Sequence, residues 1–187
     1  RWGVLAEDLR VLPGRTGLAA ATIGGMAAGA VLVPYAPGLA LGLVVAALVA
    51  HGLMALILIA TLARMAPEAR SVSPVFHLAF VAFILGALPL AQLGAIAAAT
   101  AIFWVTLTVA SAIWAVSLLQ LLHANPPAPL RPFLAIHLAP AALLSLVAGE
   151  IGLPSLALGL AVLGMMILLA LLAAARWITV AGFSPLW

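Results

Sequence analysis

The sequence has 187 residues, of which 67% are hydrophobic and 6% are charged, and its formal net charge is +3. Soluble domains carry about a quarter charged residues, so this composition excludes a soluble globular protein and predicts an integral membrane protein. The basic residues are seven arginines and no lysine, which is typical of membrane topology and argues against nucleic-acid binding. The absence of cysteine excludes disulfides, iron–sulfur clusters and thiol catalysis.

Six apolar segments follow one another along the chain. A helix that crosses a bilayer takes roughly 20 residues, and the segments between proline, glycine or charged punctuation have about that length. They cover residues 16–33, 39–63, 74–90, 95–122, 132–148 and 155–175. We therefore predict an all-α membrane protein in which residues 1–187 form a single transmembrane domain of six helices in three hairpins. Because the chain starts at Arg1 and stops after a loop-like segment at Trp187, we expect a fragment of a longer protein.

The arginines predict the orientation of these segments. All seven fall before the first segment, between the second and third, between the fourth and fifth, or after the sixth. They are Arg1, Arg10, Arg15, Arg64, Arg70, Arg131 and Arg176. Cytoplasmic loops carry an excess of arginine, so we expect this side, and both ends of the chain, to be cytoplasmic.

Helix-breaking residues distinguish the odd segments, which contain them, from the even ones. The first, third and fifth segments contain Gly24, Gly25 and Gly29, then Gly86 and Pro89, then Pro140. A proline inside a helix frees a backbone carbonyl, and lipid cannot satisfy that group. This favours odd helices that line an inner cavity and even helices that face lipid. Kinks that serve packing alone are the alternative.

Four histidines are the main polar candidates. His51 lies mid-segment and is predicted to bond to a neighbouring helix, with Gly52 allowing close approach, while His123 lies at a helix end. His77 and His137 lie near the starts of the third and fifth segments, where ionisable residues are functional candidates. A neutral histidine bonded to backbone is the simpler interpretation of each. No pair has the spacing of a helical zinc site, so neither metal nor cofactor is expected.

The acidic residues all fall in predicted loops or termini. They are Glu7, Asp8, Glu68 and Glu150. We therefore expect no acidic proton carrier within the membrane, and an interior without fixed negative charge would suit an anion. An enzyme is disfavoured because neither a catalytic constellation nor a metal cluster is visible.

Three stretches carry a family likeness. The stretch "LRPFLAIHLAPAALLSLVA" (130–148) resembles the seventh helix of the tellurite-resistance/C4-dicarboxylate transporter family, which includes the slow-type anion channels of plants. The stretch "SPVFHLAFVAFILGALPLAQLG" (73–94) is similar to the fifth helix of that family, and "RWITVAGFSPLW" (176–187) to the loop before its ninth.

The resemblance implies that the chain corresponds to helices three to eight of a ten-helix, pseudo-fivefold fold. Odd helices would line a central pore, even helices would form an outer ring, and the gate phenylalanine would lie beyond Trp187. A bacterial inner membrane location and a trimer are also implied. The expected pore-lining residues are Gly24, Gly25, His77, Phe80, Gly86, Pro89, His137, Ala139 and Pro140.

These observations predict an anion channel or transporter for small anions, such as an organic dicarboxylate, a halide, nitrate or a tellurite-like oxyanion. Arg70 and Arg131 would attract anions at the cytoplasmic mouth. The alternative is a non-transporting membrane subunit that packs against partner transmembrane helices. The expected partners are small anions and the lipid bilayer, with further copies of the chain or other membrane subunits.

Overall fold

The computed structural model describes residues 12–66 and 70–182, and side chains from residue 17 onward. The secondary structure of these residues is all helical, with short turns and loops between the helices and no β-strand in the described ranges. The elements are α2 (Leu12–Leu32), α3 (Pro37–Ala63), a π-helical turn η2 (His77–Val81), α4 (Phe83–Gln92), α5 (Ile96–His123), a 3-10 segment η3 (Ala128–His137), α6 (Leu138–Glu150), α7 (Pro154–Ala173) and α8 (Ala175–Ile178). Outside the described residues lie Arg1, Arg10, Glu7, Asp8, Glu68 and the stretch 183–187 of the third family-like motif.

A helical segment occupies each of the six predicted ranges. Four are long and apolar enough to cross a membrane: Pro37–Ala63, Ile96–His123, Ala128–Glu150 and Pro154–Ala173. Two apolar helices are shorter, Gly17–Leu32 and His77–Gln92. The prediction of an all-helical chain is therefore confirmed for the described residues, and four of its helices could span a membrane, whereas the six membrane crossings stay a prediction.

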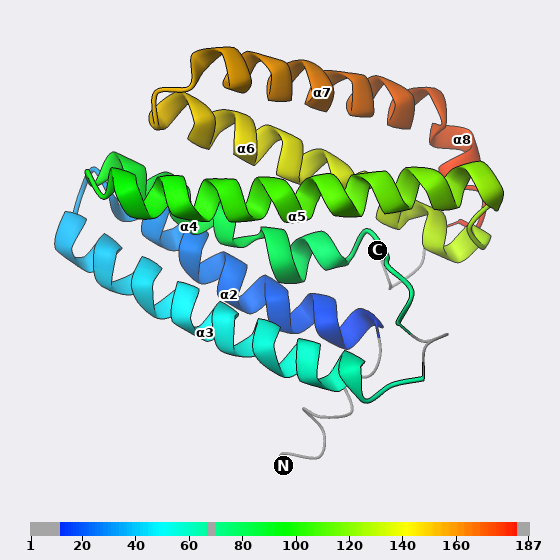
Figure 1. Cartoon of the computed structure of the whole chain (residues 1–187), viewed down its shortest axis with the longest axis horizontal. Coiled ribbons are helices and arrows are strands. Elements are labelled where there is room, and N and C mark those ends of the chain that lie inside the picture. The colour runs from blue at the N-terminus through cyan, green and yellow to red at the C-terminus, as the bar shows by residue number, and fades with distance from the viewer. Residues whose placement is uncertain (1–11, 67–69, 183–187) are drawn as a thin grey trace.

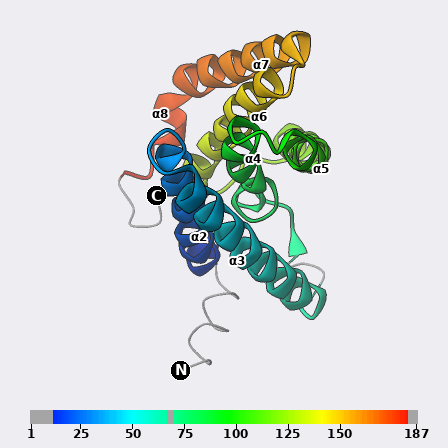
Figure 2. The same cartoon turned by 90° about the vertical axis from the view of Figure 1, so that its left-hand side faces the viewer.

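Consecutive helices pack side by side as α2 with α3, α4 with α5, and α6 with α7. Helix α4 also packs against α2, α3 and α6, which places it in the middle of the bundle (Figures 1 and 2). In Figure 1 the turns that join the three pairs lie at the left, and η3 and α8 lie at the right. We call these the turn end and the arginine end, because Arg64, Arg131 and Arg176 belong to segments at the right.

Two of the three turns share one backbone geometry. The Ala95 N–H donates to Leu90 O (2.8 Å) and the Leu153 N–H donates to Ala148 O (2.8 Å), each closing a six-residue loop around a glycine. Gly94 and Gly152 at these positions have φ of 84° and 79°. This is the Schellman arrangement, which needs a left-handed residue and satisfies carbonyls at the helix end.

Close helix contacts involve glycine at three points. A Cβ on Gly29 would overlap the Val44 side chain of α3, and a Cβ on Gly86 would lie 2.7 Å from the Leu48 side chain of α3. Gly25 also faces α3, where an added Cβ would lie 3.1 Å from Ala47. Small residues at such crossings let helix backbones approach closely in membranes.

Burial differs between the odd and even helices. Most residues of α4 are buried, and the apolar core joins Ile84 and Leu90 of α4 to Phe103 of α5 and Leu144 of α6. Large exposed apolar side chains are concentrated on α3, α5 and α7, for example Leu53, Val105, Leu118 and Leu169. This is the distribution that the sequence predicts for outer helices facing lipid.

Two prolines of the fifth segment lie near its change from 3-10 to α-helix. The fifth segment begins at Ala128 instead of Pro132, and Pro132 lies inside the 3-10 segment. Pro140 lies in the first turn of α6 instead of the middle of a continuous α-helix. The first turn leaves its N–H groups without helical partners in any case, so a proline is tolerated there.

Candidate functional site

Two irregular backbone segments, η2 and η3, form the arginine-end halves of the third and fifth predicted segments. In η2 the Ala82 N–H donates to His77 O (3.0 Å), the i to i+5 bond of a π-helix. Such π turns are frequent at functional sites. Prolines without an N–H accompany η3, with Pro129 in its first turn and Pro132 inside it, and they weaken any regular α-helix there.

The two segments bring His77 and His137 together. His77 is the first residue of η2 and His137 the last residue of η3. Their Nε2 and Nδ1 atoms lie 2.9 Å apart, within hydrogen-bond distance, and the rings meet edge to face with centroids 5.0 Å apart. Both side chains are buried, with exposed fractions of 2% and 8%. The two histidines bond to each other, so neither the simple backbone-bonded interpretation nor an isolated pore histidine describes them.

The outer nitrogens of this pair have no partner in the part of the chain that the structure describes. His77 Nδ1 and His137 Nε2 are buried and make no hydrogen bond among the described residues. Buried polar atoms are nearly always satisfied in native proteins, and an unsatisfied one calls for an explanation. The nearest aromatic neighbour is Trp114 of α5, whose ring lies 5.7 Å from that of His77 and whose Nε1–H donates to His137 O (3.3 Å).

A small cavity adjoins His77 where the three odd segments meet. It has a volume of about 110 Å³ and lies between α2, the η2–α4 segment and α6. Its lining includes Ile23, His77, Leu85, Ile136, Ala139 and Pro140. The remaining lining side chains are aliphatic, so His77 is the single ionisable group on the described wall.

A second cavity adjoins His137 on the other side of the pair. It has a volume of about 390 Å³ and lies between α5, α7 and α8, with Trp114, Ser117 and Trp177 in its lining. The buried Ser117 Oγ has no hydrogen-bond partner in the described part of the chain. The histidine pair therefore lies between two cavities whose linings are mostly apolar.

His51 forms a second polar contact, next to η2. Its Nε2 lies 3.1 Å from Ala79 O and its Nδ1 lies 2.6 Å from the Thr22 hydroxyl of α2. A carbonyl only accepts, so the neutral ring donates from Nε2 and accepts from Thr22 at Nδ1. The prediction that His51 bonds to a neighbouring helix is confirmed. A Cβ on Gly52 would be in ordinary contact with Phe83, at 3.9 Å, so Gly52 is not required for the approach.

The two arginines expected at the mouth hold helix ends together. Arg131 donates to Pro126 O (3.1 Å) and Trp177 O (3.2 Å), and its guanidinium lies 4.4 Å from the centre of the Trp177 ring. Arg70 donates to Met65 O (2.7 Å) and Ala63 O (3.0 Å), which satisfies carbonyls at the end of α3. Both guanidinium groups remain positive charges at the arginine end.

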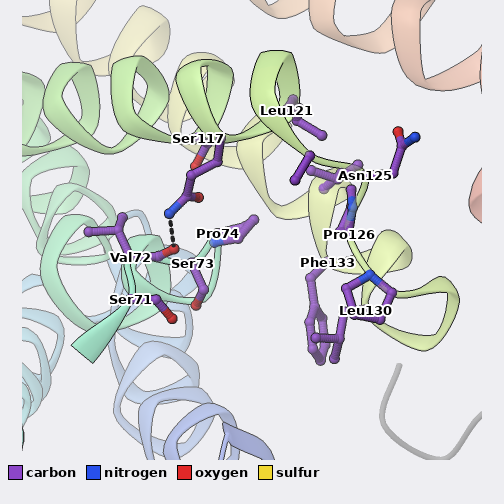
Figure 3. Close-up of a pocket in the computed structure, with 14 residues that line it drawn as sticks. Ser71, Val72, Ser73, Pro74, Ser117, Leu121, Asn125, Pro126, Leu130 and Phe133 are labelled. Carbon is purple, nitrogen blue, oxygen red and sulfur yellow. Dashed lines mark hydrogen bonds between the residues drawn. The ribbon is translucent and has the colours of Figure 1, made fainter. Parts of the chain in front are cut away.

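A mostly apolar cleft with several polar residues in its lining opens at this same end. Its volume is about 340 Å³, and Figure 3 shows Ser71, Ser73 and Pro74 facing Ser117, Asn125 and Phe133 across it. The amide of Gln120 donates to Val72 O (3.1 Å) and ties α5 to the segment before η2. Polar groups of the described chain therefore gather on the predicted cytoplasmic side.

The predicted pore residues fall into three groups. His77, Ala139 and Pro140 line the small cavity, and His137 contacts His77. Gly25 and Gly86 face α3, Gly24 is exposed without a close neighbour, and Pro89 is buried in α4. Phe80 is half-buried against Phe76, with ring centroids 5.5 Å apart. Glycine was read as a sign of a cavity wall, but two of these glycines serve helix contacts.

Three polar residues of this region, Trp114, Thr22 and Ser117, were not predicted from the sequence. Each lies in a segment whose sequence indicates a lipid-facing or ordinary helix. The partner of Trp114, His137, lies 23 residues away in the sequence, and the partner of Thr22, His51, lies 29 residues away. Polar side chains at mid-helix positions were the available signal. Among the described residues no group of three or more potential metal ligands comes together.

No protein-family model matches the sequence, and no curated protein matches it. The family resemblance of the three stretches therefore stays a prediction.

Proposed function

We propose that the protein conducts or transports small anions across a membrane, as part of the ten-helix fold of the tellurite-resistance/C4-dicarboxylate transporter family. The observation that carries this proposal is the cavity where α2, η2–α4 and α6 meet. These are the odd segments, and a pathway between them is what the family resemblance implies.

The charges of the described chain support an anion over a cation. The lining of the small cavity contains no carboxylate, and Glu150 at the end of α6 is the one acidic residue in the described ranges. Arg70, Arg131 and Arg176 lie at the arginine end. Rings of basic residues favour anions in pores, and acidic rings favour cations.

The contacts between neighbouring helix pairs also repeat along the chain. Helix α3 contacts both α2 and the following α4, and α5 contacts both α4 and the following α6. A repeat of this kind can continue into a closed ring of hairpins. The ring itself, its five-fold character and a trimeric assembly belong to the proposal.

The test is flux into proteoliposomes that contain the purified protein. We expect nitrate and chloride to enter and potassium to be excluded. Ala139→Phe fills the cavity and is expected to reduce anion flux to the level of empty vesicles, whereas Ala112→Phe on an exposed face of α5 serves as the matched control. Cation-selective flux, or the absence of flux from a well-folded protein, would favour the non-transporting membrane subunit instead.

A further inference from the structure

The second cavity, between α5, α7 and α8, is open to the surface, and we call it the α5–α7 groove. Its volume is about 390 Å³, and Leu118 of α5 and Ala170 of α7 are exposed side chains on its two walls. Figure 1 shows α5 and α7 on either side of α6. The polar residues of the lining, His137 and Ser117, have their unpartnered atoms buried. The surface that the groove offers to an occupant is therefore apolar.

The groove has the length of a lipid tail in a single leaflet. Along α7 its lining runs from Leu163 to Ala174, which corresponds to about 16 Å of helical rise. The hydrocarbon core of a bilayer is about 30 Å thick, so each leaflet contributes about half of that depth. An acyl chain that lies along the groove would stay within the leaflet on the arginine side.

A positive charge lies at the arginine end of the groove. The guanidinium of Arg131 lies 4.4 Å from the centre of the Trp177 ring, and Trp177 lines the groove. Nε and Nη1 of Arg131 donate to the carbonyls of Pro126 and Trp177, whereas Nη2 makes no hydrogen bond within the described chain. Nη2 is not one of the buried side-chain atoms that lack a partner, so it remains accessible to an occupant of the groove.

The described chain places no acidic residue beside this charge. Glu150, the one acid in the described ranges, is the last residue of α6 and lies at the turn end. Arg176 precedes Trp177 on α8, is exposed and adds a second positive charge. An occupant that fits the groove therefore joins an apolar chain to a negative group at the arginine end. Tryptophan is enriched where transmembrane helices meet the headgroup layer, which agrees with a headgroup at the level of Trp177.

We propose that the α5–α7 groove binds one anionic phospholipid, with its phosphate at Arg131 and one acyl chain between α5 and α7. A phospholipid carries both required groups, and its phosphate accepts charge-assisted hydrogen bonds from a guanidinium. Basic pockets between transmembrane helices bind lipid headgroups on the cytoplasmic side of membranes. A partner helix would cover the apolar walls but leave Nη2 without a negative partner unless it carried an acid there. This lipid site lies outside the proposed anion pathway and does not require it.

The experiment measures the tryptophan fluorescence of the purified protein in phosphatidylcholine vesicles that contain increasing fractions of phosphatidylglycerol brominated on its acyl chains. Bromine quenches a tryptophan that it contacts, and Trp114 and Trp177 line the groove. We expect quenching that saturates at a low fraction of the brominated phosphatidylglycerol. Brominated phosphatidylcholine should bind about tenfold more weakly, because it has no net negative charge.

Two variants test the two halves of the site. Arg131→Gln removes the charge and should weaken the saturable binding by about tenfold, whereas Arg64→Gln removes an exposed arginine at the end of α3 and should behave as wild type. Ala170→Phe fills the groove from its exposed wall and should abolish the saturable quenching. Ala112→Phe, on an exposed face of α5 outside the groove lining, is its control. The Ala170→Phe variant keeps the test decisive if Arg131→Gln does not fold.

Three results would overturn the lipid site. One is equal binding of the two brominated lipids, or unchanged binding in Ala170→Phe. Another is equal weakening in Arg64→Gln and Arg131→Gln, which would indicate attraction to the overall charge of the arginine end. The third is wild-type protein without saturable quenching whose oligomeric mass, measured by light scattering, falls in Ala170→Phe, because a second copy would then cover the groove. None of these results bears on anion flux, so the proposed function is tested separately.

Discussion

The two ends of the bundle satisfy the backbone groups of α4 and α6 and their neighbouring segments in different ways. At the turn end, α4 and α6 remain α-helical to their last turns, and a left-handed glycine closes each one with backbone hydrogen bonds. At the arginine end the same two segments become π and 3-10 helices, and side chains satisfy the backbone: His51 at Ala79 O, Trp114 at His137 O and Arg131 at Trp177 O. The difference indicates that regular backbone supports the turn end and that polar side chains support the irregular end.

The largest effect is expected from breaking the histidine pair at the arginine end. His77→Leu leaves His137 Nδ1 buried without a partner, which should lower the free energy of unfolding by about 1–3 kcal/mol. The double variant with His137→Leu removes both partners and should cost less than the sum of the single changes. Thermal unfolding in detergent measures the cycle, with exposed His123→Leu as the control. Additive costs would mean that the two rings stabilise the fold independently.

A smaller effect is expected at the turn end. Gly152→Ala and Gly94→Ala place a Cβ on residues with positive φ, at a cost of about 1–2 kcal/mol each. Gly149→Ala is the matched control, because this residue is helical and has open space around it; alanine there should stabilise by roughly 0.5–1 kcal/mol. The same unfolding measurement applies. Equal effects at Gly149 and Gly152 would contradict the role of the left-handed turn.

The smallest effect is expected where η3 meets α8. Arg131→Lys keeps the charge but loses the planar group that stacks on Trp177 and reaches two carbonyls, at a cost of about 0.5–1 kcal/mol. Arg176→Lys, on the exposed side of α8, should leave stability unchanged. Limited proteolysis after Arg176 would report any loosening of α8. Unchanged stability and proteolysis in Arg131→Lys would show that charge alone is sufficient there.

The predicted site shows how far local patterns extend. His77 and His137 were predicted as candidates because ionisable residues are rare in apolar segments. This prediction does not require knowing which residue each histidine contacts. Pro140 was predicted to interrupt a helix, and the fifth segment changes from the 3-10 segment η3 to α6 two residues before it. Gly25 and Gly86 were assigned to a cavity wall, whereas they contact α3. The sequence could not predict this contact, because it depends on how the helices are rotated about their axes.

The sequence by itself determined the helical class, the six helical segments and the apolar content that would suit a membrane, because hydrophobicity and length add up locally along the chain. Only the tertiary structure decided that His77 meets His137 across 60 residues, that their outer nitrogens lack partners in the described part of the chain, and that the odd segments line a cavity. Those features depend on the rotation and depth of each helix against its neighbours. Contacts between residues far apart in the sequence set this rotation and depth, so the composition of each segment does not predict them.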